Sequence, residues 1–122
     1  MQAAVQPAAA MLQEARGLLI RGWSRGAQAR DAQGRIVLPW SDDAAAWSLL
    51  GALLATWQVH DMLDADFVAH RADAQALGDA TEALGEATGS AALDQWNDAE
   101  GRNLAEVVAA VDGALAVLNG AG

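Results

Sequence analysis

The sequence of 122 residues contains no cysteine, no lysine and no tyrosine, and it has only two prolines and three threonines. Without cysteine, a disulfide framework, a thiolate zinc site and a cysteine nucleophile are all excluded. The scarcity of threonine and the presence of 31 alanines favour helix over sheet. Because 53% of the residues are hydrophobic, intrinsic disorder is excluded as well.

Charge is distributed unevenly along the chain. Seven arginines stand against sixteen acidic residues, which gives a net charge of −9. Residues 1–40 carry a net +3, residues 41–100 carry −11, and residues 101–122 carry −1. A chain this negative repels a phosphate backbone, so direct nucleic-acid binding is disfavoured. The split predicts that the basic first third lies against the acidic middle, within one chain or between two.

No segment of the sequence has the features of a membrane span or a targeting signal. The longest uncharged stretch in its centre, residues 44–59, has sixteen residues and falls short of the roughly 20 needed to cross a bilayer. The first eleven residues lack the basic start of a signal peptide. We therefore expect a cytoplasmic protein that does not engage a membrane.

The spacing of apolar residues predicts one domain, residues 1–122, of mainly α class: a compact bundle of about four helices. The expected helices are residues 7–21, 44–59 and 63–87, a further turn within residues 90–96, and a last helix after Asn103. Asn103 and Glu106 have the spacing of a capping box at the start of that last helix. Gly22 is placed to end the first helix in a left-handed conformation.

A short β-hairpin is expected between the first two helices. Asp31 and Gly34 occupy the first and fourth positions of a type I turn, and the flanking residues 27–30 and 35–38 are the expected strands. The second helix, apolar on nearly all sides, is expected to be central, with Leu50 and Leu54 on one buried side. Its cap is expected among three residues: Ser41, Asp42 and Asp43.

Four blocks of this sequence resemble a family of small bacterial and phage proteins that is known only as a domain of unknown function. The blocks are ARGLLIRGWSRGAQARD at residues 15–31, AWSLLGA at 46–52, WND at 96–98 and EVV at 106–108. Their order and separation also fit that family, and together they span most of the chain. The resemblance implies the fold and the block boundaries, but it brings no activity, and it carries no thiol role because Ser48 stands where members often have cysteine.

Motifs for catalysis or metal binding are weak. His60 with Asp64 and His70 with Asp66 are spaced as neighbours on a helix. However, ten residues separate the histidines, about 15 Å along a straight helix, so one metal cannot bridge them. The serines lie in no GxSxG or SxxK motif, and no phosphate-binding glycine loop is present. We expect no metal, no cofactor and no catalytic residue, although the sequence does not decide whether an enzymatic activity exists.

Tryptophan and arginine define the candidate contact residues. Trp47 and Trp57 are expected to fill the core, whereas the other three tryptophans lie beside turns and arginines, where a partner can reach them. Asn97 and Asp98 follow one of these tryptophans directly. The candidate partner- or ligand-binding residues are Trp23, Arg25, Arg30, Asp31, Arg35, Trp40, Trp96, Asn97, Asp98 and Arg102. A structural alternative is that the arginines neutralise the acidic third helix and dock onto the WND block.

The sequence therefore predicts a small, acidic, non-enzymatic protein-interaction module, for example an inhibitor or adaptor in phage biology or defence. We expect it to bind a protein partner and to form a homodimer. Its acidic middle could dock onto a basic partner or imitate nucleic-acid phosphates. The alternative is a small-molecule-binding protein or small enzyme with a tryptophan-lined pocket near the WND turn. An interaction module should expose a broad apolar or acidic patch, whereas a binder should enclose one pocket.

Overall fold

The computed structural model describes residues 7–58 and 67–120, with no side chains described for residues 57–58 and 67–73. The elements in chain order are α1 (Pro7–Arg21), β1 (Ala29–Asp31), β2 (Ala44–Trp47), α2 (Leu49–Gln58), α3 (Phe67–Thr88), α4 (Leu93–Asp98) and α5 (Leu104–Leu118). The mainly α class and the two antiparallel strands between the first two helices are confirmed. The described part contains five helices, because the turn expected near residues 90–96 is the separate short helix α4.

Helix α1 has the bounds predicted from its apolar spacing. Ala8, Leu12, Ala15 and Leu19 form its buried stripe, at steps of three and four residues. The helix ends before Gly22, as predicted, but the predicted left-handed conformation of this glycine is wrong, because its φ is not positive. It is instead required for packing, because a Cβ atom there would collide with the carbonyl oxygen of Ala45.

The small sheet differs from the predicted hairpin. Strand β1 pairs antiparallel with β2, with Ala29 opposite Trp47 and Arg30 opposite Ala46. The expected pairing of residues 27–30 with 35–38 is reduced to one isolated bridge, between Arg30 and Ile36. The strand β2 was predicted as the start of a helix, but on its other edge Trp47 exchanges backbone hydrogen bonds with Gly22 and Ser24, which hold it extended.

Helix α2 consequently begins at Leu49, five residues later than expected. Its cap is Ser48, whose hydroxyl oxygen accepts a hydrogen bond from the backbone N–H of Gly51 at 3.0 Å. The predicted caps at residues 41–43 are wrong for this reason. The fully buried leucines of α2 are Leu49 and Leu53, and the predicted Leu50 and Leu54 are only partly buried.

The last three helices follow their local signals. Helix α3 runs unbroken to Thr88 and ends at Gly89, which has φ 73°. The capping box of α5 is confirmed: the side chain of Asn103 accepts from the N–H of Glu106, and the Glu106 carboxylate accepts from the N–H of Asn103. The helix ends before Gly120, as predicted, with φ 76° at that glycine.

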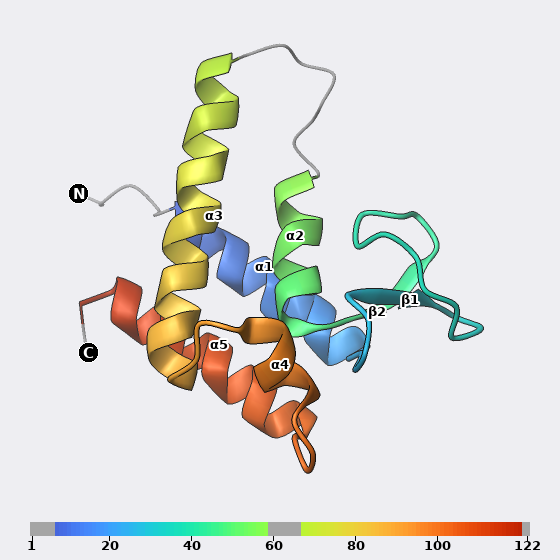
Figure 1. The fold of residues 1–122 in the computed structure, drawn as a ribbon. Coiled ribbons are helices and arrows are strands. Elements are labelled where there is room, and N and C mark those ends of the chain that lie inside the picture. The colour runs from blue at the N-terminus through green and yellow to red at the C-terminus, as the bar shows by residue number, and fades with distance from the viewer. Residues whose placement is uncertain (1–6, 59–66, 121–122) are drawn as a thin grey trace.

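Figure 1 shows the helices gathered around α1, with the strands and their connecting loop projecting to one side. Helix α1 packs against α2, α3 and α5, so it shares the central place that the sequence predicted for the second helix alone. The core between them is lined mainly by small and aliphatic side chains, and Trp47 is its one tryptophan with a buried side chain among those described. The loop of residues 32–43, here called the display loop, projects with the two strands to one side of the helices (Figure 1).

Candidate functional site

The side chain of Asn97 joins two blocks that are far apart in the sequence. Its Oδ1 accepts a hydrogen bond from the indole N–H of Trp23 at 2.8 Å and another from the backbone N–H of Leu49 at 3.0 Å. Its Nδ2 donates to the carbonyl of Ser24 at 3.0 Å and to Oδ1 of Asp98 at 2.9 Å. These four bonds use the full capacity of an amide side chain, and Asn97 is completely buried.

Neighbouring residues strengthen the same connection. Asp98 accepts from the backbone N–H of Gly26 at 2.9 Å, which anchors the turn after Trp23. Arg25 donates from one guanidinium nitrogen to the carbonyl oxygens of Asp98 and Ala99, at 2.9 and 2.8 Å. Asp98 is the last residue of α4 and Ala99 follows it, and carbonyl groups at the C-terminal end of a helix lack partners within the helix, so a guanidinium satisfies them well.

Arg102 contacts Trp96 of α4 in two ways. Its Nε donates to the carbonyl of Trp96 at 2.9 Å, and its guanidinium carbon lies 3.8 Å from the centre of the Trp96 ring. This is a close cation–π contact on a partly buried ring. The WND block is therefore a structural joint: it brings together Trp23, Arg25, Trp96, Asn97, Asp98 and Arg102.

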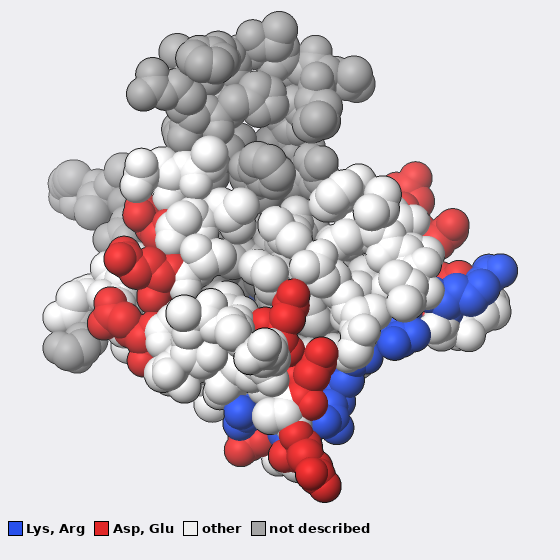
Figure 2. All heavy atoms as spheres, in the orientation of Figure 1, with Lys and Arg blue, Asp and Glu red and all other residues white. Residues whose placement is uncertain are grey.

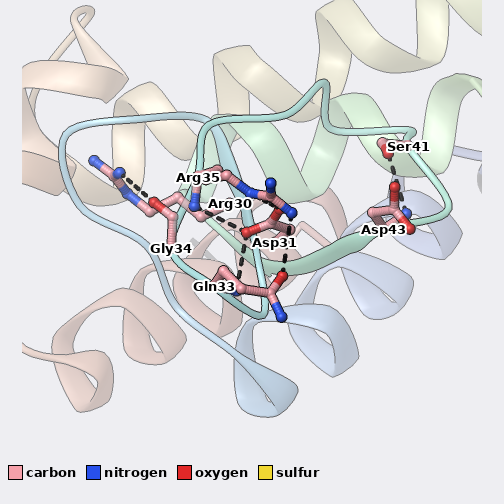
Figure 3. Close-up of polar contacts among 7 residues, drawn as sticks. All are labelled: Arg30, Asp31, Gln33, Gly34, Arg35, Ser41 and Asp43. Carbon is pink, nitrogen blue, oxygen red and sulfur yellow. Dashed lines mark hydrogen bonds and ion pairs between the residues drawn. The ribbon is translucent and has the colours of Figure 1, made fainter.

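The remaining predicted site residues lie elsewhere, in and beside the display loop (Figure 3). Asp31 Oδ1 accepts from the backbone N–H groups of Gln33 and Arg35, and its Oδ2 accepts from Arg35 Nε, each at 2.9 Å. The backbone hydrogen bond from Arg35 is the largest cause that lowers the pKa of Asp31, and it prevails over burial, which acts to raise it. The turn at Asp31 is confirmed by the hydrogen bond from Gly34 N to Asp31 O, at 2.9 Å.

The display loop is also fixed at its other end. The indole of Trp47, buried in the core, donates to the carbonyl of Pro39 at 3.0 Å. The side chain of Val37 packs against the core, and Ser41 Oγ accepts from the N–H of Asp43 at 3.1 Å. The loop is thus held at both ends by hydrogen bonds and by packing on the core.

This ordered loop presents apolar side chains to solvent. Ile36, Leu38 and Trp40 are 68%, 58% and 43% exposed, and Ile20 at the end of α1 is the fourth large apolar residue of this kind in the described chain. The sequence prediction included Trp40 but missed Ile36 and Leu38. Their signal was present in the alternation of residues 36–38, where Val37 between them faces the core.

The clefts among the described residues are poorly suited to a small ligand, because one is small and the other is open to solvent. Beside the WND helix, Gly26, Ala27, Gln28, Ser48, Asp94 and Asp98 line a cleft of about 220 Å³. No tryptophan lines it, so the predicted tryptophan-lined pocket is not found at this place. A larger hollow of about 620 Å³ between α3 and α4 is open to solvent and is bordered by Glu82 and Glu86. Ligand pockets usually enclose about 300–1,000 Å³ and cover most of their ligand. The first cleft is smaller than this range, and the second is too open to cover a ligand.

Charged groups on the surface do not form the ion pairs that the sequence predicted. Figure 2 shows acidic side chains on the left, over α3, and others at the lower centre and the upper right, next to the basic side chains along the lower right edge. The ion pairs within the described residues are Arg16 with Asp112, Arg35 with Asp31 and Arg102 with Glu106. None of these joins the basic first third to the acidic middle, but Arg25 donates to the carbonyls of Asp98 and Ala99, so its predicted docking on the WND block is confirmed. The expected neutralisation of α3 is not found among the described residues, because Arg30 donates to the carbonyls of Gly34 and Arg25, and Arg35 pairs with Asp31.

Two further sequence features have a limited outcome. The side chains of the two histidine–aspartate pairs lie outside the described residues. No helix in the described ranges combines the length and the apolar character that a membrane span requires.

The fold and the site define a mainly helical domain with a small antiparallel sheet and a fixed, apolar loop. The chain belongs to the family of unknown function DUF6197, whose model matches residues 3–117. The predicted resemblance to a domain of unknown function is thereby confirmed. No curated protein and no solved structure matches the chain.

Proposed function

We propose that this protein is a cytoplasmic protein-interaction module, of the adaptor or inhibitor kind, and that the display loop is its contact element. The observation that carries the proposal is the exposure of Ile36, Leu38 and Trp40 within five residues of one another, on a loop fixed at both ends. Large apolar side chains in such a cluster on a rigid scaffold are typical of protein contact sites.

Charge around the loop supports the same proposal. Arg35 keeps its side chain 74% exposed while it holds Asp31, so part of its guanidinium faces solvent. Arginine and tryptophan beside an apolar centre are enriched among the residues that dominate interface energies. The predicted site residues divide accordingly: Arg35 and Trp40 belong to the contact element, whereas Trp23, Asn97 and Asp98 support the fold.

The test uses the full chain as bait in a lysate of the organism that encodes it, with captured proteins quantified by mass spectrometry. Ile36→Lys with Leu38→Lys should abolish specific capture and leave the melting temperature nearly unchanged, because both side chains are exposed. Ile20→Lys is the matched control, since Ile20 is another exposed isoleucine, 54% against 68% for Ile36, and lies outside the loop. Equal capture by the loop variant and the control would refute the display loop as contact element.

The alternative of small-molecule binding rests on the cleft beside the WND helix. Two carboxylates, Asp94 and Asp98, border it together with the amide of Gln28. If a small molecule is the natural ligand, a screen of metabolites should raise the melting temperature of the wild type. Asp94→Ala should remove that increase, because it takes away one of the two carboxylates of the cleft. The variant should still fold, since the exposed Asp94 makes only a long hydrogen bond of 3.5 Å to Gln28.

A further inference from the structure

The open hollow between α3 and α4 combines an apolar lining with two carboxylates. Gly85, Ala91 and the buried Leu93 are among its lining residues, and its volume is about 620 Å³. Glu82 and Glu86 border it from α3, and both are exposed. The two glutamates are four positions apart, so they leave the same face of the helix, about 6 Å apart along its axis.

The charge at this hollow is not compensated by a basic group. Among the described residues, neither Glu82 nor Glu86 forms an ion pair or a hydrogen bond. Residues 72–101 contain seven acidic residues and no arginine, lysine or histidine. Figure 2 shows the acidic side chains over α3 with no basic side chain beside them. The hollow therefore lies in a region of one sign of charge, which attracts cationic groups.

The turn that joins α3 to α4 at the hollow is fixed by hydrogen bonds. Thr88 Oγ1 donates to the carbonyl of Leu84 at 2.8 Å and accepts from the N–H of Ser90 at 3.1 Å. Gly89, with φ 73°, donates its N–H to the carbonyl of Gly85 at 2.9 Å. The hollow is thus bordered by a helix and by a hydrogen-bonded turn.

From these observations we infer that the hollow is a second interaction surface, which binds an arginine-bearing segment of a partner protein. The inference goes beyond the proposed function, because the hollow lies outside the display loop. An arginine side chain has a long apolar stem and a charged head. The stem matches the apolar lining at Ala91 and Leu93, and the guanidinium donates paired hydrogen bonds to carboxylates such as Glu82 and Glu86.

Charge and shape together select this kind of partner. The acidic border repels a nucleic acid, and the net charge of −9 on a second copy of the chain opposes its approach. A small ligand would leave much of its surface in water, because the hollow is open. A protein segment can extend across an open hollow. Arginines at alternate positions of an extended segment are about 6–7 Å apart, which matches the spacing of the two glutamates.

Peptide binding to the full chain tests the inference. The probe is a fluorescein-labelled peptide with two arginines separated by one alanine, and fluorescence anisotropy at low salt measures its dissociation constant. In a second peptide, citrulline replaces both arginines and keeps their shape without their charge. Glu82→Gln with Glu86→Gln should raise the dissociation constant of the arginine peptide at least about tenfold, since charged hydrogen bonds are lost. Glu14→Gln with Glu100→Gln is the matched control, because it removes the same charge from exposed positions outside the hollow.

Ala91→Phe tests the shape of the hollow without a change of charge. It fills the hollow from an exposed position, so it should weaken binding of the arginine peptide and leave the melting temperature nearly unchanged. Equal effects of the two glutamine pairs would mean that only the net charge attracts the peptide, and would overturn the inference. So would equal binding of the arginine and citrulline peptides, or full binding by Ala91→Phe.

Two further measurements identify the partner. Proteins that the full chain captures from a lysate through the hollow should be released by the arginine peptide and retained with the citrulline peptide. Release of no protein would overturn the inference, and so would sedimentation that finds a dimer of the wild type which Glu82→Gln with Glu86→Gln dissociates. The double lysine variant of the display loop should bind the arginine peptide like the wild type, so failure of one surface leaves the other intact.

Discussion

The indole nitrogen of Trp23 lies 2.8 Å from the side-chain oxygen of Asn97, which is 74 residues further along the chain. Through this contact and its neighbours, the side-chain amide of Asn97 in α4 holds the turn that follows α1 and the start of α2. Two sequence blocks that suggested a binding site are thus parts of one buried joint. Because four hydrogen bonds use the full capacity of the buried Asn97 side chain, the main effect of the joint is on the stability of the fold.

Replacement of Asn97 by alanine should be among the most damaging single changes in the chain. It leaves the Trp23 indole and the Leu49 N–H without their acceptor in a buried place, and each orphaned group costs roughly 1–3 kcal/mol. We expect Asn97→Ala to lower the free energy of unfolding by about 2–4 kcal/mol in chemical denaturation. Gln95→Ala, an exposed change in the same helix, is the control and should be nearly neutral. A near-neutral Asn97→Ala would mean that the joint does not contribute to stability.

Burial within α2 predicts a difference between two adjacent leucines. Leu53 is fully buried and Leu54 only partly so. Leu53→Ala should therefore cost about 2–5 kcal/mol, and Leu54→Ala should cost distinctly less, about 1 kcal/mol. Denaturant titrations followed by circular dichroism measure both values. Equal losses at the two positions would contradict the assignment of the buried side.

Two glycines inside helices should respond to alanine with opposite signs. A Cβ atom at Gly51 would overlap the carbonyl group of Gln28, which α2 approaches at this point, so Gly51→Ala should destabilise by about 1–3 kcal/mol. At Gly78 in α3 a Cβ atom meets open space, and Gly78→Ala should stabilise by about 0.5–1 kcal/mol. Thermal unfolding of both variants decides the matter, and a gain at Gly51 would contradict the close approach.

The Asp31 turn should make stability depend on pH in the acid range. Hydrogen bonds from Arg35 and Gln33 favour the ionised carboxylate and lower the pKa of Asp31 in the folded state. The stabilisation is therefore complete above the ordinary carboxyl pKa of about 4 and is lost as the pH falls through the lower folded pKa. Asp31→Asn should melt below the wild type at pH 7.

The same melting curves measured down to pH 2 give the check on that assignment. The difference between Asp31→Asn and the wild type should shrink as the pH falls, because protonation removes the advantage of the carboxylate. Glu82→Gln, an exposed change on α3, is the matched control and should leave the pH profile unaltered. A constant difference between Asp31→Asn and the wild type across this range would refute the role of the charge.

Local signals account for what the sequence could predict. Helix α1 follows from its spaced apolar residues, and α5 from Asn103 and Glu106, because both depend on neighbours within one or two turns. Strand β2 could not be predicted, since alanine is a poor strand former and the segment is extended only by its pairing with distant residues such as Ala29. The role of Asn97 was hidden for the same reason, because Trp23 and Leu49 are remote in sequence.

The distance along the chain between the partners of this joint sets an order of events during synthesis. Helices α1 and α2 can pack on each other soon after Gln58 leaves the ribosome, but α4 and α5 emerge later. At about 5–20 residues per second, the interval to Leu118 lasts roughly 3–12 s. Throughout it, the side of α1 that packs on α5 is not fully covered, and Trp23 has no Asn97 to bind until α4 has emerged. The nascent chain therefore passes through a partly folded state with exposed apolar surface, in which association with chaperones or with neighbouring chains competes with completion of the fold.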